Sequence, residues 1–73
     1  MLHYAVIIEP SSTGFGAYAP DLPSCIAVGE SEAEVRDLIR EAIVFHLDGL
    51  REDGSDIPLP ATRVEYTEVQ NAV

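Results

Sequence analysis

Lysine and tryptophan are absent from this 73-residue sequence, and positive charge is scarce. The chain has four arginines and thirteen acidic residues, for a net charge of −9. A nucleic-acid-binding surface needs a cluster of Lys and Arg to neutralise phosphates, so we expect no direct DNA binding. Two interpretations of the acidity stay open. It can keep a small domain soluble, or it can steer the domain toward a basic protein partner.

Cysteine is nearly absent as well, since Cys25 stands alone. A lone cysteine cannot form an intramolecular disulfide, which suits a reducing compartment, and no cationic neighbour in the sequence activates its thiol. Long hydrophobic runs are also missing: residues 4–8 are too short for a signal peptide, and no stretch reaches the length of a membrane span. These features predict a structural thiol in a cytoplasmic protein that does not contact a membrane.

The sequence contains few residues in the arrangements that catalysis or metal binding requires. His3 and His46 have no second histidine three or four residues away and no cysteine pair, so a zinc site has no template. A serine nucleophile lacks a nearby histidine base, and the first strand carries no central carboxylate of the kind that two-metal nucleases need, because Glu9 lies at its end. We expect no catalytic residue, no cofactor and no bound metal. His46 is expected to be a packed ring in an apolar stripe.

Three short strands are predicted in the first half of the chain, at residues 4–9, 15–19 and 25–29. Each is rich in β-branched or aromatic residues, and turn-forming sequences at 10–14 and 20–24 separate them. Consecutive strands joined by short turns form an antiparallel meander.

A helix follows these strands. Ser31 and Glu34 form a capping box at its start, and Gly54 supplies a stop at its end. The apolar residues between them recur at helical spacing and predict one buried face. The predicted face consists of Val35, Leu38, Ile39, Ala42, Ile43, His46 and Leu50.

A last strand is predicted at residues 62–69, after a proline-bearing connector at 55–61. Val64 and Tyr66 would point inward. The element order is β-β-β-α-β in a single α+β domain, residues 1–73, with the helix packed on one face of the sheet. Because the helix reverses the chain, the last strand should run parallel to the first and third, and the pattern alone leaves open which edge it joins.

The predicted sheet is apolar on both faces. The first strand offers Tyr4, Val6 and Ile8 on one side but Ala5 and Ile7 on the other. A solvated face normally carries polar residues at alternate positions, and one helix covers only one face. We therefore expect a second copy or another protein to cover the bare face or its edge, and we predict a homo-oligomer, either a dimer or larger.

Several segments together resemble one family. They are residues 4–10, 16–18, 19–25, 29–31 and 47–58, of which Pro-Asp-Leu-Pro at 20–23 and Glu-Asp-Gly…Ile-Pro at 52–58 are the most specific. The sequence resembles the HicB family of type II antitoxins and their stand-alone HicB-like relatives, from residue 4 to about residue 60. The family usually has glycine where this chain has Ser24.

The resemblance implies a partially degraded ribonuclease H-like fold with the fourth strand beside the first. It also implies a non-catalytic antitoxin that binds a small basic HicA-like toxin, an mRNA-cleaving protein, and blocks its active site. Complete antitoxins carry a C-terminal DNA-binding module. Because the sequence ends at Val73, we do not expect that module here. The alternative is a stand-alone HicB-like homo-oligomeric domain with another binding role.

The Pro-Asp-Leu-Pro turn has two open interpretations. Proline fixes φ and aspartate bonds the backbone ahead of it, so the motif can be purely structural. Alternatively, Leu22 lies exposed at a rigid tip and contacts a partner. The partner-binding candidates are Phe15, Tyr18, Asp21 and Leu22, and the structural candidates are Pro20, Asp21, Leu22, Pro23, Ser31, Glu34 and Gly54. Exposed carboxylates such as Glu32, Glu34 and Asp37 should each matter little singly.

Overall fold

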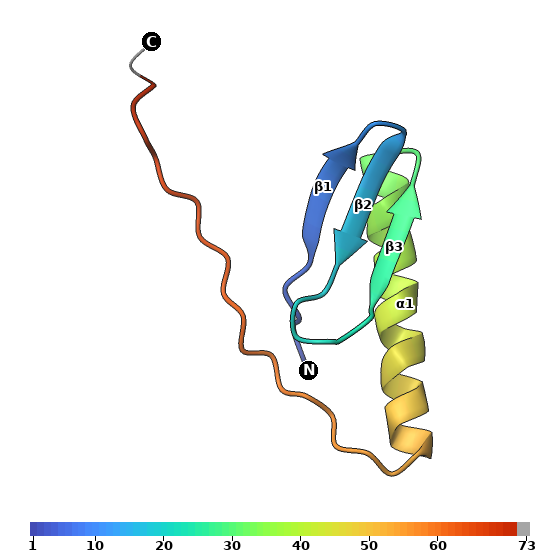
Figure 1. Cartoon of the computed structure of the whole chain (residues 1–73). Coiled ribbons are helices and arrows are strands. Elements are labelled where there is room, and N and C mark those ends of the chain that lie inside the picture. The colour runs from blue at the N-terminus through green and yellow to red at the C-terminus, as the bar shows by residue number, and fades with distance from the viewer. Residues whose placement is uncertain (72–73) are drawn as a thin grey trace.

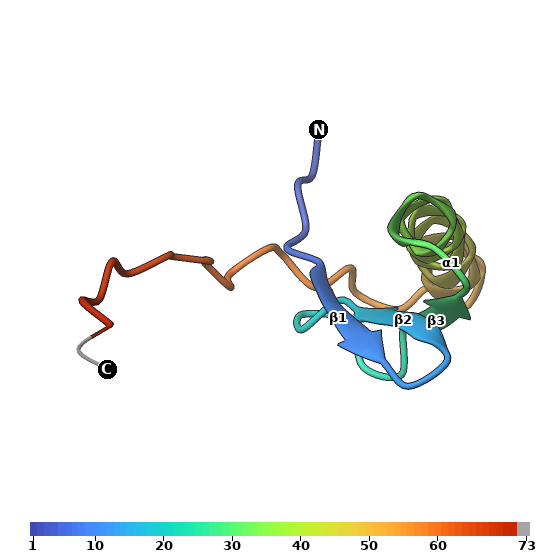
Figure 2. The same ribbon diagram turned by 90° about the horizontal axis from the view of Figure 1, so that it is seen from above.

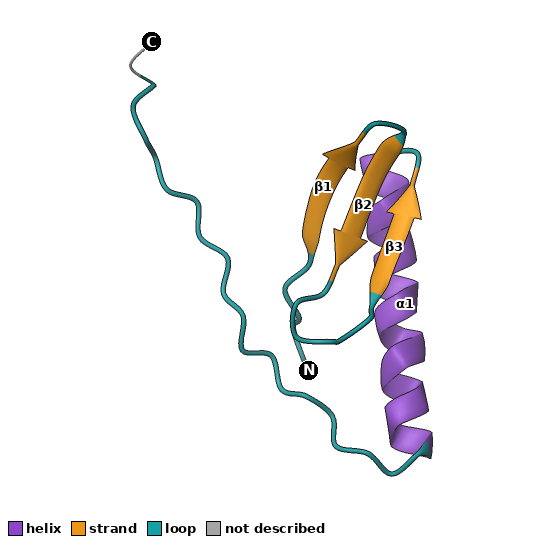
Figure 3. Ribbon diagram, in the orientation of Figure 1, coloured by secondary structure: helices purple, strands orange, loops and turns teal. Residues whose placement is uncertain are grey.

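A computed structural model describes residues 1–71 and shows a three-stranded antiparallel sheet with one helix on one of its faces (Figures 1 and 3). The elements are β1 (Ile7–Ser11), β2 (Gly14–Tyr18), β3 (Ile26–Gly29) and α1 (Glu32–Glu52). The strands lie in the order β1-β2-β3. The predicted α+β class, with an antiparallel meander followed by a helix, is confirmed.

The first hairpin is tighter than the sequence predicted. Ser11 pairs with Gly14, so only Ser12 and Thr13 form the turn, and β1 continues through Pro10. The predicted bounds of 4–9 were wrong at both ends: β1 begins at Ile7, and it runs past Pro10 because an edge strand tolerates a proline, which lacks the N–H of a ladder bond. Gly14 is required where β2 begins: a Cβ atom there would lie 2.3 Å from the carbonyl oxygen of Gly29.

The caps of α1 agree with the prediction. At the start, Ser31 Oγ accepts a hydrogen bond from the N–H of Glu34 (3.1 Å), and Glu34 Oε1 accepts one from the N–H of Glu30 (2.8 Å). At the end, Gly54 adopts a φ of 70°. Its N–H bonds the carbonyl of Arg51, and the next N–H bonds the carbonyl of Leu50, which is the Schellman arrangement that ends many helices.

The core lies between α1 and the sheet. Its buried members are Ala17, Ala19, Leu22, Cys25, Val35, Ile39 and Leu47. Two positions of the helix differ from the predicted face. Leu38 is 37% exposed, whereas Leu47, which the pattern left out, is buried. Both lie at the borders of the apolar stripe, where the position of the sheet decides which side is covered.

The Pro-Asp-Leu-Pro segment forms two successive β-turns. The N–H of Leu22 bonds the carbonyl of Ala19 (3.0 Å), and the N–H of Cys25 bonds the carbonyl of Leu22 (3.2 Å). Pro20 and Pro23 each occupy the second position of a turn, where their fixed φ is favourable. The two turns direct Ala19, Leu22 and Cys25 into the core. Leu22 is only 1% exposed, so its predicted position at an exposed tip was wrong.

Ser24 occupies a position that suits glycine. Its φ is 65°, in the left-handed region that costs an L-residue about 1–2 kcal/mol. We predict that Ser24→Gly raises the free energy of unfolding by about 0.5–1 kcal/mol. Urea unfolding measures the difference, with Ser12→Gly as the control at a turn residue whose φ is not positive. No gain from Ser24→Gly, or an equal gain from Ser12→Gly, would contradict this account.

The predicted fourth strand is not formed. Residues 55–71 contain no helix or strand, and residues 61–71 are all exposed. We call residues 62–71 the C-terminal arm. Figures 1 and 2 show the arm leaving the domain in an extended conformation, separate from β1. Within residues 1–71, therefore, the expected strand parallel to β1 is absent, and the order is β-β-β-α followed by an arm.

Candidate protein-binding site

The strand register determines which residues lie on each face of the sheet. Side chains alternate along a strand, and partners across the ladder share a face. One paired row, Ile8, Ala17 and Ala27, packs against the core beneath α1. The next row, Ile7, Tyr18 and Ile26, therefore lies on the opposite face, and Val28 joins it opposite Gly16.

This opposite face is open and carries four apolar residues, with the exposed carboxylate of Glu9 across Gly16 from Val28. Tyr18 is 41% exposed, Ile26 69% and Val28 76%, while Ile7 is half-buried. We call these four residues the outer sheet patch. A contiguous apolar surface on a small domain is typical of an interaction site, whereas single exposed apolar residues are ordinary. The sheet thus carries apolar residues on both faces, as the alternation of residues predicted, although Glu9 adds a charge to the outer face.

The four candidate contact residues occupy different environments. Tyr18 lies on the outer sheet patch. Phe15 is half-buried and packs against the core from the helix side of the sheet, and Leu22 is buried. Sequence reasoning omitted Ile26 and Val28 from the candidates, although their alternation with Cys25 and Ala27 carried the signal.

Asp21 holds the base of the C-terminal arm. Its carboxylate accepts hydrogen bonds from the N–H of Thr62 and the N–H of Ala61 (3.0 Å each) and from the Thr62 hydroxyl (2.8 Å). The bond from the Thr62 backbone, followed by those from Ala61 and the Thr62 side chain, lowers the pKa of Asp21 from its ordinary 3.8. Asp21 therefore connects the Pro-Asp-Leu-Pro turn to a segment forty residues further along the chain.

The lowered pKa predicts an acid-sensitive contact. A carboxyl group whose pKa falls on folding stabilises the fold above its unfolded pKa, and this contribution is lost as the pH falls through the folded pKa. We expect the Ala61 and Thr62 amide resonances to titrate together with the Asp21 carboxyl carbon, below pH 3.8. Asp21→Asn should abolish that titration. Asp56→Asn, on the 55–61 connector that also carries Ala61, should leave it unchanged. Ala61 and Thr62 amide shifts that do not follow the titration of Asp21 would contradict the contact.

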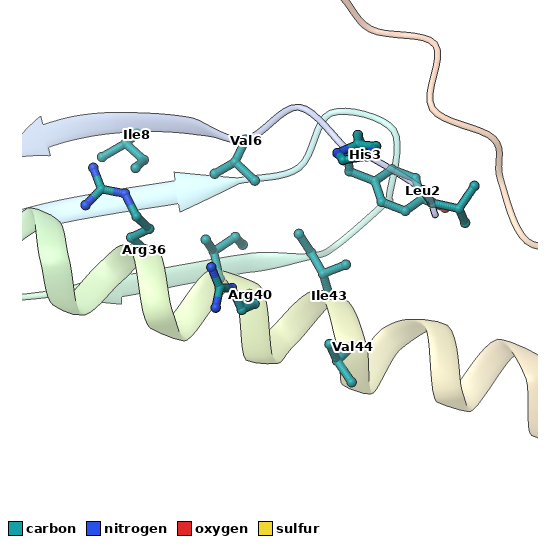
Figure 4. Close-up of a pocket in the computed structure, with 10 residues that line it drawn as sticks. Leu2, His3, Val6, Ile8, Arg36, Arg40, Ile43 and Val44 are labelled. Atoms are coloured by element: carbon teal, nitrogen blue, oxygen red, sulfur yellow. The ribbon is translucent and has the colours of Figure 1, made fainter.

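A groove lies between α1 and the chain segment that leads into β1, on the helix side of the sheet, with a volume of about 470 Å³. Val6, just before β1, and Ile8, within it, point toward the groove, and Ile43 and Val44 line it from α1 (Figure 4). Arg36 and Arg40 also line it, so two of the four arginines of the chain stand here. We call this the β1 groove. Its lining combines apolar side chains with the positive charge of Arg40, while Arg36 is paired with Glu32 at 3.3 Å.

The thiol of Cys25 and the ring of His46 are both at least partly buried. Cys25 is buried, and burial raises the pKa of its thiol. His46 is half-buried beside Ile26 and Phe45. Among residues 1–71, no three His, Cys, Asp or Glu side chains gather as metal ligands do. In the same part of the chain, α1 falls short of the length and apolar character that crossing a membrane requires.

Comparison with known proteins identifies the family of this chain. Residues 4–72 match the model of the HicB-like antitoxins of bacterial toxin–antitoxin systems. The chain belongs to this family.

Two curated relatives of this chain support the family. Antitoxin HicB 2 of Photorhabdus laumondii is 30% identical over 73 residues, covering 99% of this chain and 52% of the relative. An uncharacterized 14.9 kDa protein of the rep-hol intergenic region of Haemophilus phage HP1 is 34% identical over 55 residues, covering 75% of this chain and 41% of the relative. The chain thus spans about half the length of the curated relatives it matches.

Proposed function

We propose that this HicB-like antitoxin binds a small basic HicA-like toxin in the cytoplasm and blocks its mRNA-cleaving site without catalysing a reaction. The family match over residues 4–72 carries the proposal. The outer sheet patch supports it, because Tyr18, Ile26 and Val28 offer an apolar surface of the kind that a partner protein covers. The toxin needs a positively charged surface to bind RNA, and the charge of −9 on this chain is complementary to it.

Charge is expected to set the association rate of the toxin, and apolar contact its dissociation rate. Long-range attraction between the acidic domain and a basic toxin raises the rate of encounter. Attraction between exposed charges is screened over about 8 Å at physiological salt, so the association rate should fall as salt rises. Dissociation should depend on the outer sheet patch, since buried aromatic and apolar anchors dominate the stability of most interfaces.

A cleavage assay tests the proposed function. A purified HicA-like toxin is given an mRNA substrate, and the full chain is added in increasing amounts. We expect cleavage to stop near one antitoxin per toxin, and surface-binding kinetics in a salt series to show a falling association rate. Binding without inhibition would overturn the blocking of the active site. A salt-independent association rate would remove the electrostatic part.

The alternative is a stand-alone HicB-like homo-oligomeric domain with another binding role. The outer sheet patch also supports this function, because a second copy can cover it as well as a toxin can. A neighbouring gene for a basic protein of similar size favours the toxin. Light scattering on the chain alone provides a second criterion: an assembly whose size Tyr18→Ala reduces would favour the homo-oligomer.

A further inference from the structure

The C-terminal arm carries apolar side chains that its own domain does not cover. Tyr66 is 96% exposed, Val69 78% and Val64 48%. Along an extended chain, Val64 and Tyr66 share one side, and Arg63, Glu65 and Thr67 share the other. This alternation is typical of a strand with one buried side. The side that should be buried faces solvent in the single chain.

The base of the arm is fixed to the domain. Ile57 packs against the core, the Tyr4 hydroxyl bonds the carbonyl of Pro58, and Asp21 binds the backbone of Ala61 and Thr62. Beyond Thr62 the arm projects away from β1, as the two perpendicular views show (Figures 1 and 2). The fixed base therefore directs the apolar residues of the arm away from the arm's own sheet.

The same chain carries a matching acceptor. Within residues 1–71, β1 pairs with β2 alone, so the backbone groups along its other edge are free to pair with an added strand. The β1 groove continues this edge on the helix side, with Val6, Ile8 and Val44 in its lining. A strand added to β1 would place every second side chain over this groove.

Charge favours the arm as the occupant of the groove. The whole chain carries a charge of −9, which opposes the approach of two copies. The groove is a local exception, because Arg40 lines it, beside Arg36, which is paired with Glu32 at 3.3 Å. On the side of the arm that carries Val64 and Tyr66, the next residue is Glu68, whereas Arg63 and Glu65 share the opposite side. Glu68 of one copy thus has the charge that complements Arg40 of another.

We propose that two copies exchange their C-terminal arms, each arm adding a fourth strand to the free edge of β1 in the other copy. Val64 and Tyr66 then cover the β1 groove. The exchange supplies the strand that the sequence predicted at residues 62–69 and that the single chain does not form. It leaves the outer sheet patch open and does not depend on toxin binding.

Isotope labelling tests the exchange on the full chain. Equal amounts of ¹³C,¹⁵N-labelled and unlabelled protein are denatured, mixed and refolded. Filtered NMR experiments then detect contacts between labelled and unlabelled chains. We expect contacts between the Tyr66 ring and the methyl groups of Val6, Ile8 and Val44 to join different chains. Contacts only within one chain, a monomer in sedimentation, or a Tyr66 ring that becomes ordered only when toxin is added would each overturn the proposal.

Matched variants give a second measure. We expect Tyr66→Ala to raise the dimer dissociation constant by about tenfold or more in sedimentation equilibrium, because a covered aromatic anchor is lost. Val44→Asp should weaken the dimer from the groove side. Thr67→Ala, on the opposite side of the arm, should change the constant by about threefold or less, as most non-anchor contacts do. Equal effects of Tyr66→Ala and Thr67→Ala would overturn the proposed orientation of the arm.

Discussion

Ile39→Ala will lower the free energy of unfolding by about 2–5 kcal/mol, the range for large-to-small changes in a well-packed core. Ile39 is 2% exposed and lies at the centre of the cluster between α1 and the sheet, beside Val35. Removing three carbon atoms loses their transfer free energy and leaves a cavity that the rigid sheet cannot fill. A domain of this size has little stability in reserve, so the variant should be partly unfolded at moderate temperature.

Urea unfolding, followed by circular dichroism at one fixed protein concentration, measures the loss. The concentration must be fixed because self-association adds to apparent stability. Leu38→Ala is the matched control: it removes similar volume one residue away, but Leu38 is 37% exposed. We expect it to cost about 1 kcal/mol or less. A greater loss from Leu38→Ala would show that the helix presents a different face to the sheet.

The contrast between these neighbours shows how far the sequence predicts the core. Capping residues located the helix correctly, since Ser31 and Gly54 satisfy the backbone groups at its two ends. The apolar stripe predicted Val35 and Ile39 correctly. At its borders, periodicity does not distinguish Leu38 from Leu47. The position of a three-stranded sheet beneath the helix decides between them, and no local pattern contains that information.

The candidate site was predicted in part. Alternation predicted that the sheet would be apolar on both faces, because it is a local property of strands. The position of Leu22 depended instead on the orientation of the residue that ends the first turn and begins the second, and the pattern of prolines was compatible with either direction. Asp21 was expected to bond the backbone just ahead of it in the turn, but its partners Ala61 and Thr62 are about forty residues away. Contacts at such separation are set by tertiary structure.

The fourth strand shows a different limit. The alternation at residues 62–69 predicts a strand with one buried side, and the exposed arm of the structure retains that alternation. A sequence pattern states that a side should be buried but not which molecule buries it. In the structure the arm lies apart from its own sheet, and the free edge of β1 is the surface that matches the apolar side of the arm.

The second large effect concerns toxin binding and rests on the proposed function. Tyr18→Ala should speed dissociation of the toxin by about 30-fold or more, equivalent to about 2 kcal/mol, because tyrosines at the centre of an interface are frequent anchors. Tyr18 lies between Ile7 and Ile26 in the paired row of the outer sheet patch and is 41% exposed, so truncating it disturbs the core little. Surface-binding kinetics at physiological salt measure the change.

Two controls separate the contributions to toxin binding. Tyr66→Ala removes an exposed tyrosine from the arm and should leave toxin dissociation within about twofold of the unmodified chain, since contacts outside an anchor cluster contribute little. Asp37→Asn removes one exposed carboxylate and should slow association only slightly, because single rim charges are weak. If Tyr66→Ala speeds dissociation and Tyr18→Ala does not, the toxin binds at the arm, and the outer sheet patch is free for another partner.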